Sequence, residues 1–222
     1  GFAPDAKVIH VDIDPAELGK VRRPDVAIRG DVRVAIEALV AELSANGTGD
    51  VDRGAWRSRI SGWQERFPLA YEPWAPGEAL KPQHVIECLR DATPDDTIVS
   101  SGVGQHQMWA AQFLGFEEPK RWMTSGGLGT MGYGVPASIG VQIAHPEALV
   151  INVAGEASFM MTMQELSCAV QYMAPVKQFI LNNERLGMVR QWQQLLHGER
   201  YSHSYSEALP DFVKMAEAFG CK

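Results

Sequence analysis

Residues 149–183 read LVINVAGEASFMMTMQELSCAVQYMAPVKQFILNN. They contain two short apolar runs, Leu149–Val153 and Val176–Leu181, which are rich in Val and Ile and are bounded by Gly, Ala-Pro and Asn. Runs of this length and composition predict buried strands. With a helix between them they form a βαβ unit, so we expect parallel strands joined by a right-handed crossover.

The residues between the two strands, Thr162–Tyr172, predict that helix. Thr162 stands at the position of a capping side chain and Glu165 follows three residues later, as in a capping box. The apolar side chains at helical spacing are Met163, Leu166, Val170 and Met173.

Polar groups follow both strands. The first strand is followed by Gly155-Glu156-Ala157-Ser158 and the second by Asn182-Asn183. If the strands are neighbours, these ends lie roughly 5 Å apart, at the edge where open α/β sheets bind ligands. A carboxylate and an amide oxygen suit Mg²⁺, and the small residues admit a diphosphate. The alternative, equally compatible with the local pattern, is a solvated turn glutamate and an ordinary strand end.

Two motifs carry a resemblance to a known family. Gly155-Glu156-Ala157, then 24 residues, then Asn182-Asn183 resembles the thiamine-diphosphate motif Gly-Asp-Gly followed by Asn-Asn. The continuation NNERLGMVRQWQ, residues 182–193, resembles the large catalytic subunit of the acetolactate synthase (acetohydroxyacid synthase) family, and the resemblance extends over essentially the whole chain. One departure is that Glu156 stands where the family has Asp, which adds a methylene to a site with strict geometry.

The resemblance implies an α/β fold: a three-layer, parallel-sheet thiamine-diphosphate-binding domain preceded by part of a Rossmann-like domain. The domains expected are residues 1–43, the end of a middle domain that contacts FAD; residues 44–79, a linker with a helix; and residues 80–222, the diphosphate- and Mg²⁺-binding domain, incomplete at its C-terminus. Small, polar and Gly residues cluster at Ser44–Asp52, which favours a boundary there. The chain is therefore expected to be a piece of a longer protein.

Composition narrows the function classes. The 222 residues carry a net charge of −7, which argues against nucleic acid or an anionic membrane as partner. No apolar run has the length of a membrane span, and no signal peptide opens the chain. Cys88, Cys168 and Cys221 lack metal-ligand spacing, and the first two fall in expected helices, so we expect reduced thiols in a cytoplasmic protein.

The first 43 residues predict two strands, Lys7–Ile13 and Val26–Ile28, and an amphipathic helix, Val32–Leu43. Asp12 at the end of the first strand has two interpretations, a ribose acceptor or the cap of a short helix. The resemblance assigns FAD contacts to Asp12, Ile13 and Asp31. Two strands and one helix cannot close a sheet, so this part is expected to be incomplete by itself.

Residues 53–114 supply further elements. The pattern predicts helices at Arg53–Phe67, Pro82–Leu89 and His106–Leu114, and a strand at Thr97–Ser101. The Gly-bracketed loop 102–106 follows that strand and is a second candidate ligand-facing turn, although a lone His at a helix start is more often a surface residue. In the resembled family the counterparts of Val103, Gly104, Gln105 and His106 line the diphosphate pocket.

Residues 124–136, TSGGLGTMGYGVP, contain a formal dinucleotide fingerprint, Gly127-x-Gly129-x-x-Gly132. We reject it because Arg121–Thr124 looks too short and polar to be the strand that must precede it. A loop permitting close approach to a flat ligand, followed by a small-residue helix at Gly134–Ala144, is the better interpretation. By resemblance, Gly126 and Gly127 contact flavin, Gly129 contacts the pyrimidine, and Met131 supports the bent cofactor.

The segment after the second strand completes the candidate site. By resemblance, the metal receives the Glu156 carboxylate, the Asn183 side-chain oxygen and the Arg185 backbone carbonyl, while Leu186, Gly187 and Met188 border the cofactor. Trp192 matches a residue that lines the substrate channel; the alternative is an aromatic anchor on a helix surface.

The function implied is decarboxylation of pyruvate and carboligation to a second 2-keto acid, pyruvate or 2-ketobutyrate, in branched-chain amino-acid biosynthesis. The cofactors implied are thiamine diphosphate, Mg²⁺ and FAD. The partners implied are further copies of the same subunit, in a homodimer or homotetramer, and a small regulatory subunit. The family's activating Glu lies in an N-terminal domain that this chain lacks, so the chain alone is expected to be inactive. The alternatives are another thiamine-diphosphate-dependent decarboxylase or carboligase, and a non-catalytic cofactor-binding relative.

Overall fold

The structure, a computed structural model, describes residues 3–47 and 51–222. The chain divides into two compact units, Gly1–Pro68 and Leu69–Lys222. The expected boundary at Ser44–Asp52 falls partly on residues 48–50, which lie outside the described residues. Helix α2 (Gly54–Arg66), predicted as part of a linker, belongs to the first unit. No helix of the described residues is both long enough and apolar enough to cross a membrane.

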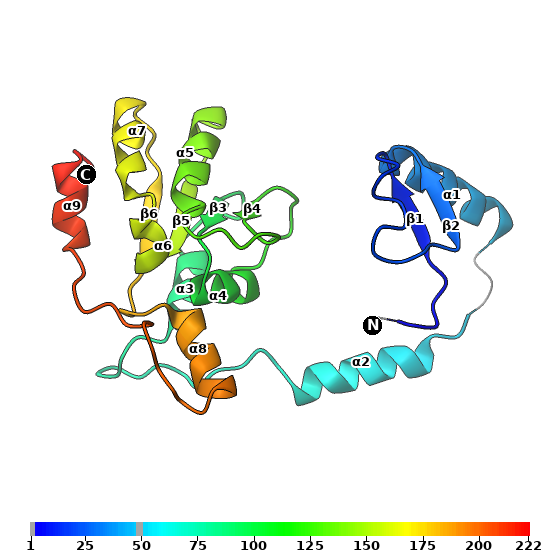
Figure 1. Cartoon of the computed structure of the whole chain (residues 1–222), viewed down its shortest axis with the longest axis horizontal. Coiled ribbons are helices and arrows are strands. Elements are labelled where there is room, and N and C mark those ends of the chain that lie inside the picture. Colours follow the sequence, from blue (N-terminus) through cyan, green and yellow to red (C-terminus); the bar gives the residue numbers. More distant parts are fainter. Residues whose placement is uncertain (1–2, 48–50) are drawn as a thin grey trace. The chain divides into compact units, whose positions relative to one another are not determined.

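The first unit contains the strands and the helix predicted for it. Strands β1 (Ile9–Asp12) and β2 (Val26–Arg29) pair in parallel, with Ile9 opposite Val26 and Asp12 opposite Arg29. Helix α1 (Val32–Asn46) follows β2 (Figure 1). The Asp31 side chain caps α1 by accepting hydrogen bonds from the backbone N–H groups of its second and third residues.

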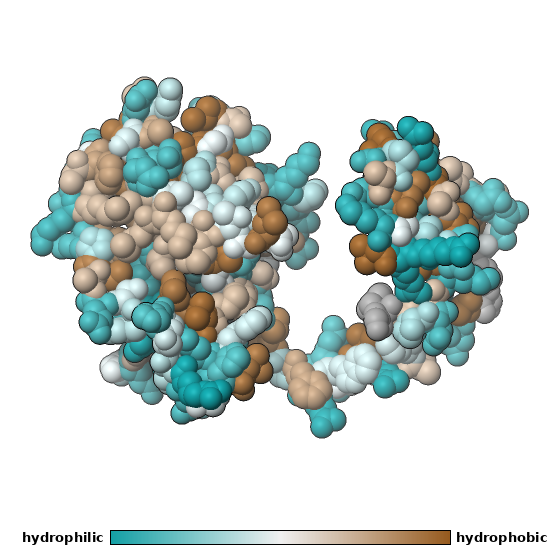
Figure 2. Space-filling model, in the orientation of Figure 1, coloured by the Kyte–Doolittle hydropathy of each residue, from teal (hydrophilic) through white to brown (hydrophobic). Residues whose placement is uncertain are grey.

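The apolar residues of α1 are not covered by the described part of this unit. Their exposed fractions range from 40 % to 63 %, although the helix has the amphipathic pattern of one that packs on a sheet. Figure 2 shows apolar residues among hydrophilic ones on the surface of this unit. The exposed apolar residues of α1 are Val32, Val34, Ile36, Leu39, Val40 and Leu43.

A four-stranded parallel sheet forms the centre of the second unit. Its strands are β3 (Ile98–Ser101), β4 (Trp122–Thr124), β5 (Val150–Gly155) and β6 (Lys177–Leu181), arranged in the order β4-β3-β5-β6. Strands β5 and β6 are direct neighbours. The predicted parallel βαβ unit is therefore confirmed, and the carboxyl ends of its strands meet at one edge of the sheet.

Strand β4 corrects the sequence analysis. Trp122–Thr124 does form a strand, which pairs in parallel with Val99–Ser101, so a strand precedes the Gly-rich loop and our ground for rejecting the dinucleotide fingerprint was wrong. The ladder gives this short segment its conformation, because strand propensity depends on cross-strand neighbours more than on the segment itself. Its first residue, Trp122, packs on Phe116 with ring centroids 5.1 Å apart.

Helices cover both faces of the sheet and produce the three layers that were expected (Figure 1). One core cluster joins the sheet to α3 (Pro82–Asp91) and α4 (Gln105–Phe113). Because strand side chains alternate, Val99, Ile151 and Val153 face this cluster. The opposite cluster joins the sheet to α5 (Gly134–Ala144), α6 (Glu156–Met160), α7 (Leu166–Gln171) and α9 (Phe212–Ala218).

The helix predicted at Thr162–Tyr172 is interrupted. A short helix, α6, begins directly after β5; a 3₁₀ turn, η1 (Met163–Glu165), and then α7 follow. Thr162 makes no side-chain cap, and its hydroxyl donates to the Gly132 carbonyl at 2.8 Å. Of the four apolar residues at helical spacing, Leu166 is buried in α7, whereas Val170 is exposed in the same helix and Met173 is exposed beyond its end.

The cysteines lie largely where the sequence places them. Cys88 is in α3 and Cys168 in α7, and both of these thiols, like that of Cys221, are free. Helix α8 (Gly187–Leu196) begins six residues after the end of β6, with residues 182–186 between them.

Candidate functional site

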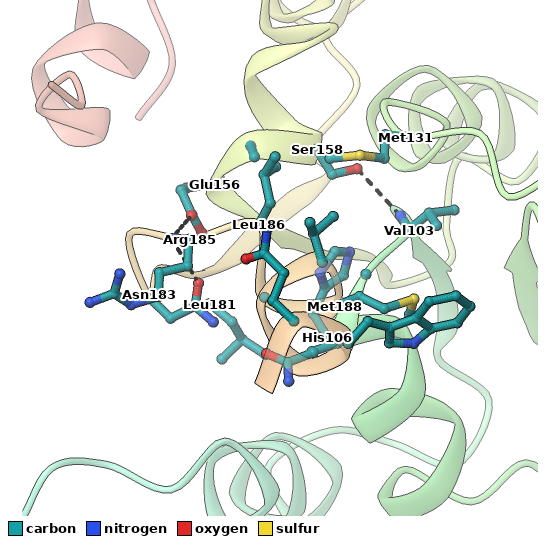
Figure 3. A pocket seen from close by; sticks show the side chains of 18 of the residues that line it. Val103, His106, Met131, Glu156, Ser158, Leu181, Asn183, Arg185, Leu186 and Met188 are labelled. Carbon is teal, nitrogen blue, oxygen red and sulfur yellow. Dashed lines mark hydrogen bonds between the residues drawn. The ribbon is translucent and has the colours of Figure 1, made fainter. Parts of the chain in front are cut away.

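Loops at the carboxyl edge of the sheet enclose a cavity of about 720 Å³ (Figure 3). They follow β3, β5 and β6, and the β4–α5 loop adds to them. The cavity thus lies at the edge of the sheet where the sequence predicted a ligand. The predicted site residues that line this cavity are Val103, Gly104, Gln105, His106, Gly129, Met131, Gly155, Glu156, Ala157, Ser158, Asn183, Arg185, Leu186, Gly187, Met188 and Trp192.

Ser158 joins two of these loops to helix α6. Its Oγ accepts hydrogen bonds from the backbone N–H of Val103 at 3.3 Å and of Gly132 at 2.9 Å. Because Ser158 is buried in α6, it fixes the loops after β3 and β4 against the helix that follows β5. Gly102 permits this contact, since a Cβ there would overlap the Ser158 side chain. The floor of the cavity is therefore held by a side chain rather than by the sheet alone.

Glu156 and Asn183 converge on one backbone amide. The N–H of Arg185 donates to Oε1 of Glu156 at 2.8 Å and to Oδ1 of Asn183 at 3.2 Å (Figure 3). Glu156, the first residue of α6, is only 1 % exposed. The intervening residue Glu184 has φ +56°, and its N–H bonds to the Asn182 side chain at 3.0 Å, which makes the tight turn that carries Asn183 back toward Glu156.

This oxygen set suits a hard cation. A carboxylate, an amide oxygen and a backbone carbonyl are ligands that Mg²⁺ accepts, with phosphate oxygens completing the octahedron. Within residues 3–47 and 51–222, no group of three His, Cys, Asp or Glu side chains could hold a metal. These described residues therefore contain no site of the kind that soft metals prefer. The oxygen atoms of Glu156, Asn183 and the Arg185 carbonyl are instead of the type that Mg²⁺ binds.

His106 is buried against the end of β5. A Cβ on Gly155 would lie 2.8 Å from Nδ1 of His106, so the imidazole occupies space that only a glycine leaves free. Desolvation lowers the pKa of His106 from 6.5 to about 4. In the described part of the chain its Nε2 has no hydrogen-bond partner. The side chain is therefore neutral at pH 7 and lines the cavity as a polar but uncharged group.

Gln105 ties the loop after β3 to α8. Its Nε2 donates to Oε1 of Gln191 at 2.8 Å. Gly187, the first residue of α8, leaves room for this side chain, because a Cβ there would lie 2.9 Å from Cδ of Gln105. Helix α8, which forms one wall of the cavity, is therefore held in position by Gln105 from the loop on the opposite wall.

Some lining residues were missed by the sequence analysis. Val189 and Gln193 share a face of α8 with Met188 and Trp192, so helical spacing around Trp192 would have found them. Trp109 follows Gln105 by one turn of α4 in the same way. Leu181, at the end of β6, and His197 and Arg200, which follow α8, carried no such signal.

Five other predicted site residues are not among those that line this cavity. Gly126 and Gly127 are exposed in the β4–α5 loop and do not line it. Asp12, Ile13 and Asp31 belong to the first unit. The Asp12 carboxylate accepts from the N–H of Asp14 at 2.8 Å, which makes a turn rather than the short helix that we considered.

Comparison with known proteins gives two family matches. Residues 102–222 match the family described as thiamine pyrophosphate enzyme, C-terminal TPP binding domain, and residues 1–39 match the central domain of the same enzymes. Thiamine pyrophosphate is thiamine diphosphate. The first match contains every residue that lines the cavity described above.

Similar proteins share nearly the whole of this chain. It is 50 % identical to an acetolactate synthase of Mycobacterium leprae, over 99 % of the chain and 36 % of that protein. It is 46 % identical to an acetolactate synthase large subunit of Corynebacterium glutamicum and 49 % identical to that of Porphyra purpurea, over 99 % and 100 % of the chain. The chain spans a little over a third of the length of these relatives. Since the TPP-binding family covers more than half of it, this chain belongs to the thiamine pyrophosphate enzymes.

Proposed function

We propose that this chain is part of the large catalytic subunit of an acetolactate synthase. The proposed reaction is decarboxylation of pyruvate and ligation to a second 2-keto acid, pyruvate or 2-ketobutyrate, giving acetolactate or acetohydroxybutyrate for branched-chain amino-acid synthesis. The observation that carries this proposal is the identity of 46–50 % to proteins with that name along essentially the full chain.

In this proposal the cavity at the sheet edge holds the diphosphate end of thiamine diphosphate. Glu156, Asn183 and the Arg185 carbonyl hold Mg²⁺, and Ser158 and the loop after β3 surround the phosphate groups. When bound, the cofactor supplies the electron sink that breaking a bond beside a carbonyl requires. The convergence of Glu156 and Asn183 on one amide supports this assignment, because their oxygens are already oriented before a cation arrives.

Met131 and Trp192 have proposed roles at the reacting end. Met131 lies on the same side of the cavity as Ser158 and would support the ring system in its bent form (Figure 3). Trp192 is 59 % exposed and also lines the cavity, which suits a side chain bordering the substrate channel better than one that anchors a core. Neutral His106 adds a polar contact without adding charge near the phosphates.

The remaining assignments are proposals on the same basis. FAD would contact Asp12, Ile13 and Asp31, and Gly126 and Gly127 on the other domain, with domain boundaries near residues 43 and 80. The activating carboxylate would come from a partner copy in a homodimer or homotetramer. A small regulatory subunit and a cytoplasmic location complete the proposal. The 222-residue chain alone should therefore form no acetolactate, and detectable product from it would contradict this part.

The deciding experiment measures acetolactate formed from pyruvate by the full-length reading frame that contains this chain. Thiamine diphosphate and Mg²⁺ are each added and omitted. Acetolactate that depends on both supports the proposal and shows that Glu156 serves where the family has Asp. Acetaldehyde as main product would assign a decarboxylase instead. No turnover, with Glu156→Asp restoring it, would assign a cofactor-binding relative with a disabled metal site.

A further inference from the structure

A second cavity of about 310 Å³ lies next to the turn that carries Asn183. It is lined by Arg185, Arg190 and the five consecutive residues 201–205, Tyr-Ser-His-Ser-Tyr. Of these residues, only Arg185 also lines the cofactor cavity. Arg185 therefore belongs to both places, with its backbone N–H bonded to Glu156 and Asn183 and its side chain directed to the second cavity.

Both arginines in this cavity are stacked on tyrosines. The guanidinium carbon of Arg185 lies 4.5 Å from the ring centroid of Tyr205, and that of Arg190 lies 5.6 Å from the ring centroid of Tyr201. A guanidinium held over an aromatic ring by such a contact still has N–H groups available for an anion. Neither arginine forms an ion pair with a carboxylate of the described residues.

No acidic side chain of the described residues lines the cavity, and His203 adds an imidazole that can donate a hydrogen bond. Glu184 and Glu199 are close in sequence to the lining segments but are not part of the wall. The local charge is thus positive in a chain whose net charge is −7. A concave surface with two unneutralised guanidinium groups attracts an anion.

The walls of this cavity are fixed by hydrogen bonds. Arg185 and Tyr205 form an antiparallel backbone bridge, and the N–H of Leu186 donates to the Ser204 carbonyl at 3.0 Å. Ser204 is buried, and its Oγ donates to Oε1 of Gln193 at 2.8 Å. The segment that carries both tyrosines is therefore held in place, and little ordering would be needed on binding.

We propose that this second cavity binds the phosphate group of a small molecule. A phosphate monoanion or dianion offers three or four oxygens and can engage two guanidinium forks at once, whereas a single carboxylate has the two oxygens that one fork satisfies. The volume is at the lower end of small-molecule sites, which suits a phosphate with a small body. The source is either inorganic phosphate or a small phosphate ester.

In the test, phosphate is titrated into protein already saturated with thiamine diphosphate and Mg²⁺, and binding is measured by isothermal titration calorimetry. Saturation prevents the added phosphate from reporting on the cofactor cavity. Inorganic phosphate and glycerol 3-phosphate are used in separate arms, and the tighter ligand identifies the source. Binding of thiamine diphosphate is measured first by itself, and absence of this binding would count against the proposed function. In that case the phosphate titrations are repeated without cofactor, and the comparison of the variants still tests the second cavity.

Arg190→Gln should weaken phosphate binding by at least about tenfold, because it removes charge-assisted hydrogen bonds. Arg190→Lys keeps the charge but loses the planar fork, so a smaller loss is expected and this variant serves if the first fails to fold. Arg66→Gln is the matched control, because Arg66 also stacks on an aromatic ring, 5.1 Å from the centroid of Phe67, but lines neither cavity. It should bind phosphate as the unchanged protein does.

Three results would overturn the proposal. The first is that neither phosphate nor its ester binds. The second is that Arg190→Gln and Arg190→Lys both bind as tightly as the unchanged protein. The third is that Arg66→Gln loses as much affinity as Arg190→Gln, which would mean that phosphate responds only to overall charge.

Discussion

The backbone N–H of Arg185 lies 2.8 Å from Oε1 of Glu156, although 29 residues separate the two in sequence. This hydrogen bond joins the first turn of the helix after β5 to the loop after β6. The same N–H reaches Asn183 at 3.2 Å. A carboxylate that is one methylene longer than that of Asp is thus held in a defined place and is not free in solvent.

Removing the charge of Glu156 should weaken cation-dependent cofactor binding. Glu156→Gln keeps the size of the side chain but replaces a carboxylate by an amide, a poorer ligand for Mg²⁺. We expect the Mg²⁺ concentration needed for half-maximal binding of thiamine diphosphate to rise by at least about tenfold, by analogy with the loss caused by altering metal-site partners. Tryptophan fluorescence titration measures it. Glu184→Gln, an exposed neighbour of Asn183, is the control, and equal behaviour of both variants would remove Glu156 from the metal site.

Two glycines of α5 should respond oppositely to alanine. A Cβ on Gly134 would lie 2.6 Å from the backbone nitrogen of Gly102 and 2.9 Å from the backbone carbon of Ser101, so Gly134→Ala forces backbone apart and should destabilise by roughly 2 kcal/mol or more. A Cβ on Gly140 would meet nothing within 4 Å, so Gly140→Ala should stabilise by up to about 1 kcal/mol through helix propensity. Urea unfolding measures both, and a stabilising Gly134→Ala would contradict the close approach of α5 to β3.

Stability should depend on pH through His106. Its pKa is lowered from 6.5 to about 4 by burial, so between these values the unfolded chain binds a proton that the folded chain does not. The free energy of unfolding should therefore be unaffected above pH 6.5 and fall as pH drops toward 4, by on the order of 3 kcal/mol over that range. Urea unfolding at several pH values tests this, and His106→Asn should lose this part of the slope. Identical slopes in the two proteins would show that His106 titrates normally.

Loss of the Ser158 hydroxyl should leave two backbone N–H groups without an acceptor. Ser158→Ala removes the oxygen that both Val103 and Gly132 use, so a destabilisation of about 2 kcal/mol is expected. Ser138→Ala is the matched control, because that buried hydroxyl only donates to the carbonyl of Val135 within α5. It should cost less than half as much in urea unfolding. Hydrogen exchange at Gly132 should speed up in Ser158→Ala alone, and an unchanged rate would contradict the role given to Ser158.

The parallel βαβ unit and the edge of the sheet that carries the cavity could both be predicted from the sequence. Apolar runs bounded by glycine and asparagine are local signals, and the polar residues after Leu181 and Gly155 must meet once the two strands are neighbours. The family resemblance added residue roles that spacing alone left open, such as those of Met131 and Trp192.

Features that depend on partners distant in sequence could not be predicted in this way and are seen only in the folded chain. Strand β4 is formed by pairing with β3, and the Thr162 hydroxyl, which the local pattern assigned to a helix cap, bonds instead to Gly132, 30 residues away. The low pKa of His106 comes from burial, which no local pattern reports. The second cavity, too, arises only when Arg185 and Tyr205 pair across a loop. The propensity for a helix or a strand depends on neighbouring residues and can be estimated from the sequence. Burial and long-range hydrogen bonds exist only after the chain has folded.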